Sequence, residues 1–349
     1  MGRTPTRSMY LDALRTLALF RVVLYHASSM WTLTVFTAMP LMFFIAGSLF
    51  ASSLERRSGR KVIVDRYRRI LFPYWLYVVA LVVLWAAIGV IGEVNPLAWI
   101  SFAMPVLSFG GPKGPPGQPI DMTWIALWYL QMHLILSLVG PWLRSMQQRH
   151  GRRFWIAISI FCALTAPIGL GIWTMCWCVG YLQHDGVLDR WLPPRWKWIA
   201  AISGTAGAAL FFALHSDVES GAGIGAMPLG VFWVTVAIGL QDRLEPLLAG
   251  RRVRSFLHWS SSRSLTIYLW HMMLIYATVE LAFPGSGSAV GRVVWCLALL
   301  PPVILLVGWI EDLAARKSPR LWPRLPAADV SGQSVPNTRS PASPKPGTM

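Results

Sequence analysis

The first apolar segment of the chain places an arginine and a histidine on one helix face. Arg15 and His26 are eleven residues apart, which is three helical turns plus about 20°, so the two side chains lie nearly in line. Their separation along the helix axis is about 16 Å, half the thickness of a hydrocarbon core. A neutral imidazole can take a proton from a hydroxyl, and a guanidinium can hold an anionic group. This pair is therefore the first candidate for chemistry.

His26 also has an interpretation that needs no chemistry. A histidine in an apolar segment can simply bond to a carbonyl of a neighbouring helix. Ionisable groups at that depth are costly, however, and by default they mark a site. Ser29 follows His26 by one turn, and Asp12 precedes Arg15 by three residues and can pair with it. These neighbours favour a functional role for the line from Arg15 to His26.

Arg21, His271 and Glu280 also fall inside apolar segments. Arg21 lies about 240° round the helix from Arg15, and it should face the interior of the protein or a hydrated cavity. His271 and Glu280 share a later segment. Either of these two could orient His26 or contact a substrate, and either could be a polar packing residue. Arg21 receives no role from the sequence.

A second cluster of arginines precedes another apolar segment. Arg66 and Arg69 are three residues apart with Arg68 between them, and Phe72-Pro73-Tyr74-Trp75 follows. Residues at i and i+3 share a helix face, and paired guanidinium groups suit the capture of phosphates. The same residues could instead be ordinary basic flanks of a membrane span. Both interpretations stay open on spacing alone.

The composition predicts the elements that position these residues. Of the 349 residues 55% are hydrophobic and 13% are charged, whereas soluble proteins carry about 25% charged residues. The apolar residues come in runs long enough to cross a bilayer. We therefore expect an all-α, polytopic membrane protein with about ten transmembrane helices. The expected spans are 11–31, 36–54, 72–92, 122–143, 154–170, 172–186, 198–215, 225–241, 262–284 and 291–311.

The loop charges support this arrangement. With ten spans, all but four of the 31 Lys and Arg residues fall in the termini and in the loops on one side. The exceptions are Lys113, Arg292, Arg15 and Arg21. Such a bias makes the basic side cytoplasmic, with both termini inside. The net charge of +16 therefore indicates no nucleic-acid partner, and it favours contact with anionic lipid head groups and an anionic soluble ligand.

The composition along the chain and the cysteine spacing indicate the domain organisation. We expect residues 1–317 to form one membrane domain and 318–349, rich in Pro, Ser and Ala, to form a disordered cytoplasmic tail. The four cysteines fall in or beside predicted spans. Their spacing matches no zinc motif and implies no disulfide. We expect no metal site and no permanently bound cofactor.

Five stretches of the chain together resemble the acyltransferase-3 family of integral membrane acyltransferases. The first is Leu11-Asp12-Ala13-Leu14-Arg15 with Arg15 and His26 at the R-x10-H spacing. The others, in the family's order, are Met42-Phe43-Phe44-Ile45-Ala46-Gly47, the Arg66-x-x-Arg69 approach to Phe72-Pro73-Tyr74-Trp75, Trp124-x3-Trp128-Tyr129-Leu130, and Ser264-Leu265-Thr266-Ile267-Tyr268-Leu269-Trp270-His271. The resemblance covers residues 9 to about 311. It departs from the common pattern at Arg21, where aliphatic residues are usual.

The resemblance implies a multi-pass enzyme of the bacterial inner membrane. Such an enzyme moves an acyl group from cytoplasmic acyl-CoA, a co-substrate, to a hydroxyl of a carbohydrate, a lipid or a small glycosylated molecule. Residue by residue, it implies that Arg15 and His26 are the catalytic pair and that Arg66, Arg69 and also Arg68 contact CoA. A transporter or flippase for a lipid-linked or anionic solute is the alternative, because it also needs many spans and intramembrane charge. A non-catalytic scaffold would leave Arg15 and His26 unexplained.

Overall fold

The computed structural model describes residues 9–107, 112–117, 120–165, 170–192, 194–214 and 226–321, and this part of the chain is helical and contains no strand. The helices are α1 (Met9–Ser28), η1 (Trp31–Val35), α2 (Ala38–Arg56), α3 (Gly59–Ala87), η2 (Ile91–Glu93), α4 (Ala98–Ala103), η3 (Pro105–Leu107), α5 (Met122–Ile125), α6 (Trp128–His150), α7 (Arg152–Thr165), α8 (Leu170–His184), α9 (Val187–Trp191), α10 (Trp196–Leu214), α11 (Ala226–Leu244), η5 (Glu245–Ala249), α12 (Arg251–Ser262), α13 (Ser264–Glu280), α14 (Ala289–Val307) and α15 (Trp309–Ala314).

The all-α prediction is confirmed, and each of the ten expected spans coincides with a helix. These helices are α1, α2, α3, α6, α7, α8, α10, α11, α13 and α14. By length and composition four helical stretches can cross a membrane, and they are Thr32–Arg56, Gly59–Ala87, Met122–His150 and Ala289–Val307. The count of ten spans and the orientation of the termini stay predictions. Most of the predicted tail, 318–349, lies outside the described residues.

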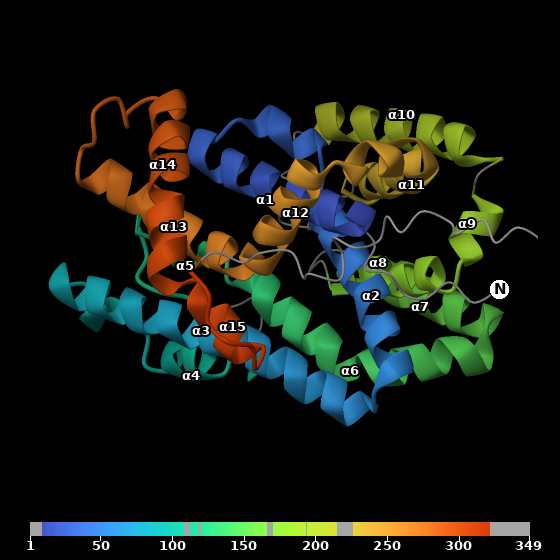
Figure 1. The fold of residues 1–349 in the computed structure, drawn as a ribbon, viewed down its shortest axis with the longest axis horizontal. Coiled ribbons are helices and arrows are strands. Elements are labelled where there is room, and N and C mark those ends of the chain that lie inside the picture. The colour runs from blue at the N-terminus through green and yellow to red at the C-terminus, as the bar shows by residue number, and fades with distance from the viewer. Residues whose placement is uncertain are drawn as a thin grey trace, which may run out of the picture.

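Two boundaries differ from the sequence expectation in ways that matter for the site. α3 begins at Gly59, well before the span expected at 72–92, so Arg66 and Arg69 lie on the same continuous helix as the apolar segment. At the other end of the chain, α14 stops at Val307 and the short helix α15 follows after Gly308. The break at Gly308 turns α15 toward α3 (Figure 1).

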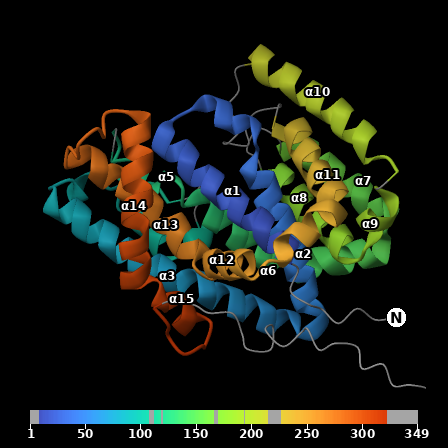
Figure 2. The same ribbon diagram turned by 45° about the horizontal axis from the view of Figure 1, so that its top comes forward.

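Helix α1 lies at the centre of the molecule. Figures 1 and 2 show it between α13 and α14 on one side and α2 and α11 on the other, and it packs against all four of them and against α12. Its core-facing side chains include Ala18, Leu19, Val22 and Val23, none more than 1% exposed. The helix that carries Arg15 and His26 is therefore held on several sides.

Helices α2 and α8 approach each other through two glycines. A Cβ on Gly47 would lie 2.0 Å from the Trp177 carbonyl oxygen, and one on Gly180 would lie 2.2 Å from the Phe44 carbonyl oxygen. Both positions meet backbone, so no side chain can move away to make room. Small residues permit this kind of close helix contact in membrane proteins. The contact fixes α2, which lines the cavity described below.

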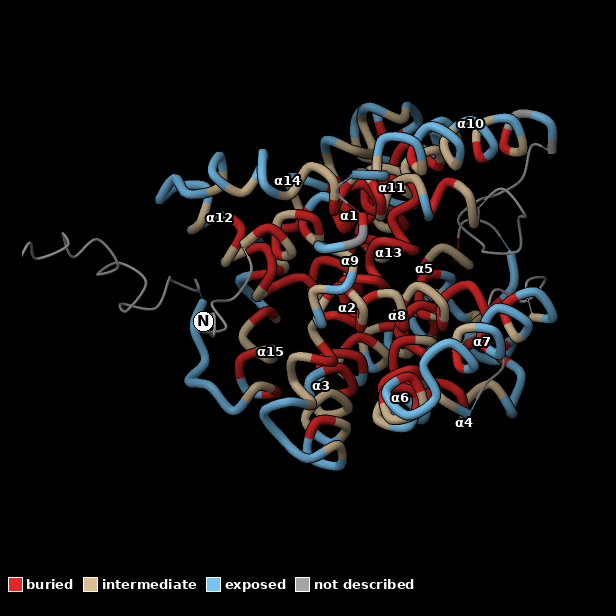
Figure 3. The backbone as a smooth tube through the Cα atoms, turned by 90° about the vertical axis from the view of Figure 1, so that its right-hand side faces the viewer, coloured by how far each residue is buried: buried red, intermediate tan, exposed pale blue. Residues whose placement is uncertain are grey.

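The periphery of the molecule is apolar. In Figure 3 the buried backbone gathers in the middle, around α1, α2, α8 and α13, and the outer helices are largely exposed. Exposed side chains on these outer helices include Val79 and Val83 of α3, Trp198 and Ile202 of α10, and Leu306 of α14. Exposed apolar helix faces are what contact with lipid requires.

The glycine contact between α2 and α8 gives a test of the packing. Gly47→Ala should destabilise the purified protein by about 1–3 kcal/mol, because overpacking against backbone forces the helices apart. The measurement is the thermal unfolding midpoint in detergent. Gly92→Ala is the matched control, since a Cβ there meets no heavy atom within 4 Å. Equal midpoints for the two variants would contradict the close approach.

Candidate active site

A cavity of about 370 Å³ opens beside α1. Its walls come from α1, α2, α3, α6, α12, α13 and α15 and from residues just after α15. Five cationic side chains line it: Arg15, Arg56, Arg66, Arg69 and Lys317. The structure thus brings together three of the residues singled out in the sequence, Arg15, Arg66 and Arg69, from two separate helices.

The arginines of the cavity lack carboxylate partners. Among the described residues, no carboxylate lies within salt-bridge distance of Arg15, Arg66 or Arg69. The guanidinium of Arg66 lies 5.9 Å from the centroid of the Phe50 ring, which keeps it close to α2. Partly buried cations without counterions raise the local potential and favour binding of an anion.

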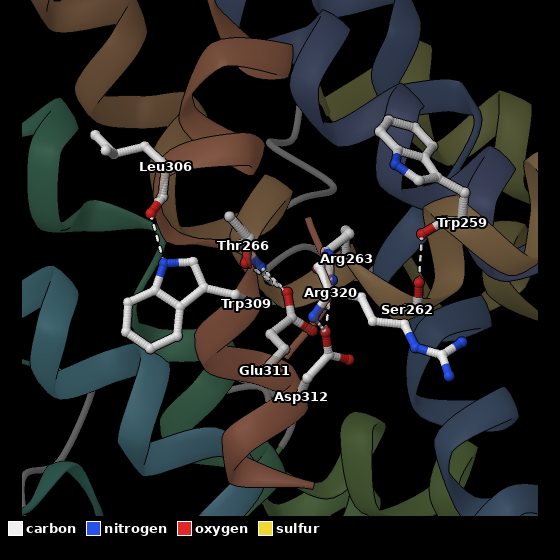
Figure 4. A network of polar contacts seen from close by, with 9 residues as sticks. All are labelled: Trp259, Ser262, Arg263, Thr266, Leu306, Trp309, Glu311, Asp312 and Arg320. Atoms are coloured by element: carbon white, nitrogen blue, oxygen red, sulfur yellow. Dashed lines mark hydrogen bonds and ion pairs between the residues drawn. The ribbon is translucent and has the colours of Figure 1, made fainter. Parts of the chain in front are cut away.

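The carboxylates of the same cavity are engaged by other groups. The Ser261 hydroxyl donates to Asp12 at 2.8 Å. Asp312 accepts from the buried Arg263 at 2.7 Å. Glu311 accepts from the backbone N–H of Thr266 at 2.7 Å and from its hydroxyl at 2.5 Å. Figure 4 shows the contacts of Glu311 and Asp312, which tie α15 to Arg263 and to the start of α13.

Glu311 lies on α15, beyond the end of the apolar helix α14. Removal of its carboxyl from water raises its pKa from 4.5 to about 7, although the two hydrogen bonds from Thr266 and the charges of Arg263 and Arg15 act in the opposite direction. Near neutral pH, Glu311 is therefore partly protonated. In its neutral form it does not offset the positive charge of the cavity.

Arg68 does not line the cavity. Its Nε donates to the Ala314 carbonyl oxygen at 2.8 Å, and Ala314 is the last residue of α15. Arg68 therefore holds the wall that carries Glu311 and Asp312, while its neighbours on α3 face the open space. The three arginines that the sequence grouped together divide into two that line the cavity and one that supports it.

Aromatic and imidazole rings connect the inner end of the cavity to the histidine of α1. Tyr129, His133 and Tyr268 line the cavity. Tyr268 lies 5.1 Å from Tyr129 and 5.7 Å from His271, measured between ring centroids. His271 in turn lies 5.4 Å from His26. His26 itself is not in the cavity wall, so the ring of Tyr268 and that of His271 lie between the two.

The hydrogen bonds of His271 leave one of its nitrogens unpaired. His271 is fully buried, and its Nδ1 lies 2.6 Å from the Tyr268 carbonyl oxygen. Because a carbonyl only accepts, Nδ1 carries the proton, and Nε2 is left with a lone pair. Nε2 is buried and has no hydrogen-bond partner among the described residues. His26 is half-buried and its ring centroid lies 5.4 Å from that of His271, so an N–H of His26 is a candidate donor.

The guanidinium of Arg21 donates hydrogen bonds to a backbone carbonyl oxygen. Its Nε donates to the Leu33 carbonyl oxygen at 2.7 Å and its Nη2 donates to the same oxygen, and its guanidinium lies 5.0 Å from the Tyr25 ring centroid. Arg21 thereby fixes η1 against the end of α1 that carries His26. Glu280, the other unassigned residue, is exposed at the end of α13 and does not line the cavity.

One group outside the cavity has the side chains of a metal site. Ligand atoms of Glu55, His184 and Asp185 lie within 4.8 Å of one another. Other contacts account for their positions: His184 Nε2 lies 2.9 Å from a Glu55 carboxylate oxygen, and both oxygens of Asp185 accept from Arg144. With its carboxylate engaged by a guanidinium, Asp185 is a poor metal ligand.

The sequence comparison identifies the family. The family model described as an acyltransferase domain, Acyl_transf_3, matches residues 9–311. The chain therefore belongs to the acyltransferase-3 family, as the motifs had indicated, and carries a membrane acyltransferase domain. No curated protein and no solved structure matches the chain significantly. The matched range includes every cavity-lining helix except the second half of α15, which ends at Ala314.

The raised pKa of Glu311 predicts how stability depends on pH. The folded protein holds a proton on this carboxyl that the unfolded chain releases, so stability should fall as the pH rises from about 5 to about 7.5. Glu311→Gln should flatten this fall, as measured by the thermal unfolding midpoint across that range. Glu280→Gln, at an exposed carboxylate, is the control. Equal slopes for wild type and Glu311→Gln would refute the assignment.

Proposed function

We propose that the protein is an O-acyltransferase of the bacterial inner membrane that moves an acyl group from cytoplasmic acyl-CoA to a hydroxyl of a carbohydrate, glycolipid or glycosylated metabolite. The carrying observation is a cavity in which Arg15, Arg66 and Arg69 have no carboxylate within salt-bridge distance among the described residues, and which connects to His26 through the rings of Tyr268 and His271. Such an arrangement supports an anionic donor on one side and a hydroxyl acceptor on the other.

The donor is held at the cationic end of the cavity. Arg66 and Arg69 contact the phosphates of CoA, for which guanidinium groups offer bidentate hydrogen bonds. Arg15 lies deeper along α1 and contacts an anionic or carbonyl group of the arm. The apolar side chains of Met42, Ile45 and Leu49 also line the cavity. They pack along the narrow pantetheine arm of CoA, between Arg15 and the arginines of α3. Arg68 acts indirectly, through the carbonyl that it holds on α15.

The reacting end of the donor is brought to the pair of histidines. His26 takes the proton of the acceptor hydroxyl as its oxygen attacks the thioester carbonyl. The C–O bond forms and the C–S bond breaks, and the departing thiolate recovers the proton from His26. His271 Nε2 accepts the other N–H of His26, which orients the ring and stabilises the imidazolium that forms. The acyl ester and free CoA thiol are the products.

Removal of the imidazole tests the general base. His26→Ala should lower the rate of acyl transfer by about 10²-fold or more, the usual contribution of such a group. The measurement is protein- and acceptor-dependent release of CoA thiol from acetyl-CoA by membranes, with mass spectrometry of envelope glycans and lipids for the added acyl group. His184→Ala is the control, because that histidine pairs with Glu55 away from the cavity.

The outcomes of this assay separate the enzyme from a transporter. A wild-type rate in His26→Ala would refute its role as the base. Absence of acceptor-dependent thiol release from the wild-type protein, across acyl donors, would favour the transporter or flippase alternative. His271→Ala should lower the rate less than His26→Ala does, since it removes orientation while the base remains.

The division among the three arginines of α3 gives a second test. Arg66→Ala and Arg69→Ala should each raise the KM for acyl-CoA about tenfold or more, because a charge-assisted contact to phosphate contributes about 1.5–3 kcal/mol. Arg68→Ala, at the residue bonded to Ala314, should change the KM much less. Steady-state kinetics with varied acyl-CoA provide the measurement. A larger effect at Arg68 than at Arg66 would reverse the assignment.

A further inference from the structure

A second hollow lies on the outside of the helix bundle, away from the cationic cavity. It measures about 610 Å³ and is formed by α6, α7 and the first turns of α8. Eleven of its fourteen lining residues are apolar, and the other three are His150, Arg153 and Thr174. The Thr174 hydroxyl already donates to the Leu170 carbonyl oxygen. The hollow, called the lateral groove below, shares no lining residue with the cationic cavity.

The two basic residues of the lateral groove, His150 and Arg153, lie at one end. His150 is the last residue of α6 and Arg153 is the second residue of α7, and Gly151 turns the chain between them with a φ of +47°. Phe161, further along α7, also lines the groove, and eight helical residues separate it from Arg153 by about 12 Å. The groove is therefore cationic at the α6–α7 turn and apolar along the rest of its length.

The lateral groove opens toward the surroundings of the bundle. Trp142, one of its lining residues, is 61% exposed. Ile156 and Ile160, on α7 next to the groove, are also exposed and apolar. α6 belongs to a stretch that can cross a membrane by length and composition. An outward-facing apolar groove on such a helix meets lipid chains.

The guanidinium of Arg153 at the end of the groove forms no ion pair with a described residue. Among the described residues, no carboxylate lies within salt-bridge distance of Arg153. Arg149 and Arg152 flank it in the sequence and raise the local positive potential. A guanidinium at the membrane interface suits a phosphate, and basic residues there attract anionic lipids by about 1 kcal/mol each.

We propose that the lateral groove binds one anionic phospholipid, with its phosphate at Arg153 and His150 and one acyl chain along α6 and α7. The groove is long, apolar and open at the side, which fits a chain entering from the bilayer. Its cationic end lies at a helix turn, where a head group reaches the interface. This binding needs no acyl-transfer chemistry, so it stands or falls separately from the proposed function.

The test is native mass spectrometry of the detergent-purified full chain with phosphatidylglycerol or with phosphatidylcholine of the same chain length. Wild-type protein should retain phosphatidylglycerol at a severalfold lower concentration than phosphatidylcholine. Arg153→Ala should weaken retention of phosphatidylglycerol about tenfold, since it removes a charge-assisted contact. Arg152→Ala, at the neighbouring exposed arginine that does not line the groove, should weaken it much less.

A second pair of variants tests the acyl-chain part of the groove. Ala157→Phe fills the groove from an exposed position and should weaken retention of both lipids, whereas Ser159→Phe on the same helix lies outside the lining and should not. Thermal unfolding checks that both variants fold, and if Ala157→Phe does not fold, the arginine pair decides.

Three results would overturn the proposal. The first is equal retention of the two lipids by the wild-type protein. The second is equal loss in Arg153→Ala and Arg152→Ala. The third is a concentration-dependent dimer that forms in the wild-type protein and is lost in Ala157→Phe, because a second copy would then be the occupant. Competition by inorganic phosphate without loss of the lipid mass would show that the phosphate contact alone does not hold the lipid.

Discussion

The structure depends on a group of cations that the protein does not neutralise. Arg15, Arg66 and Arg69 converge on one cavity from α1 and α3, and the nearby carboxylates are engaged by Ser261, Arg263 and Thr266. Removing charges from water is costly unless they are paired. The fold therefore holds these three guanidinium groups in one cavity without a carboxylate in salt-bridge distance among the described residues, which is the property that the proposed anionic donor would use.

Rigid packing is what keeps such a site open. Like charges repel, so helices that carry them need apolar and backbone contacts elsewhere to stay in place. α1 is enclosed by α2, α11, α12, α13 and α14, and α2 is fixed against α8 where Gly47 and Gly180 let backbones touch. The wall formed by α15 is held differently, through the hydrogen bonds from Arg68 and Arg263 to α15 and to the segment after it. Close helix packing thus holds the walls formed by α1 and α2, and hydrogen bonds hold the wall formed by α15.

The sequence predicted what depends on position within one helix. The spacing of Arg15 and His26, the shared face of Arg66 and Arg69, and the helical nature of all ten apolar segments follow from the 3.6-residue period and from hydropathy. The structure places these residues as the spacing requires, except that Arg68 reaches the neighbouring α15. Contacts of that kind depend on how helices are rotated against each other, which no local pattern encodes.

The same reason explains the residues that the sequence did not assign. The sequence could not distinguish His271 from a packing histidine, because what sets His271 apart is its ring contact with His26 on another helix. Glu311 was not singled out, since it became important only when α15 folded back onto Thr266. Tyr129 and Tyr268 both fall within the stretches that resemble the family, so there was a reason in the sequence to notice each of them. Their contact in the cavity wall depends on the tertiary structure.

The distance between the cations and the histidines divides the proposed reaction into two tasks. Contacts to the CoA phosphates are the same before and during acyl transfer, so they bind the ground state and the transition state equally and cannot by themselves accelerate the chemical step. They can hold the thioester in place, which removes the entropic cost of bringing two reactants together. Stabilisation that appears only in the transition state must come from groups near the carbonyl. The proposed groups are His26 and His271, whose rings are in contact beyond Tyr268, and the unpaired lone pair on His271 Nε2 would favour the protonated form of His26. In the proposed reaction, the cation cluster selects the donor and the two histidines determine the rate.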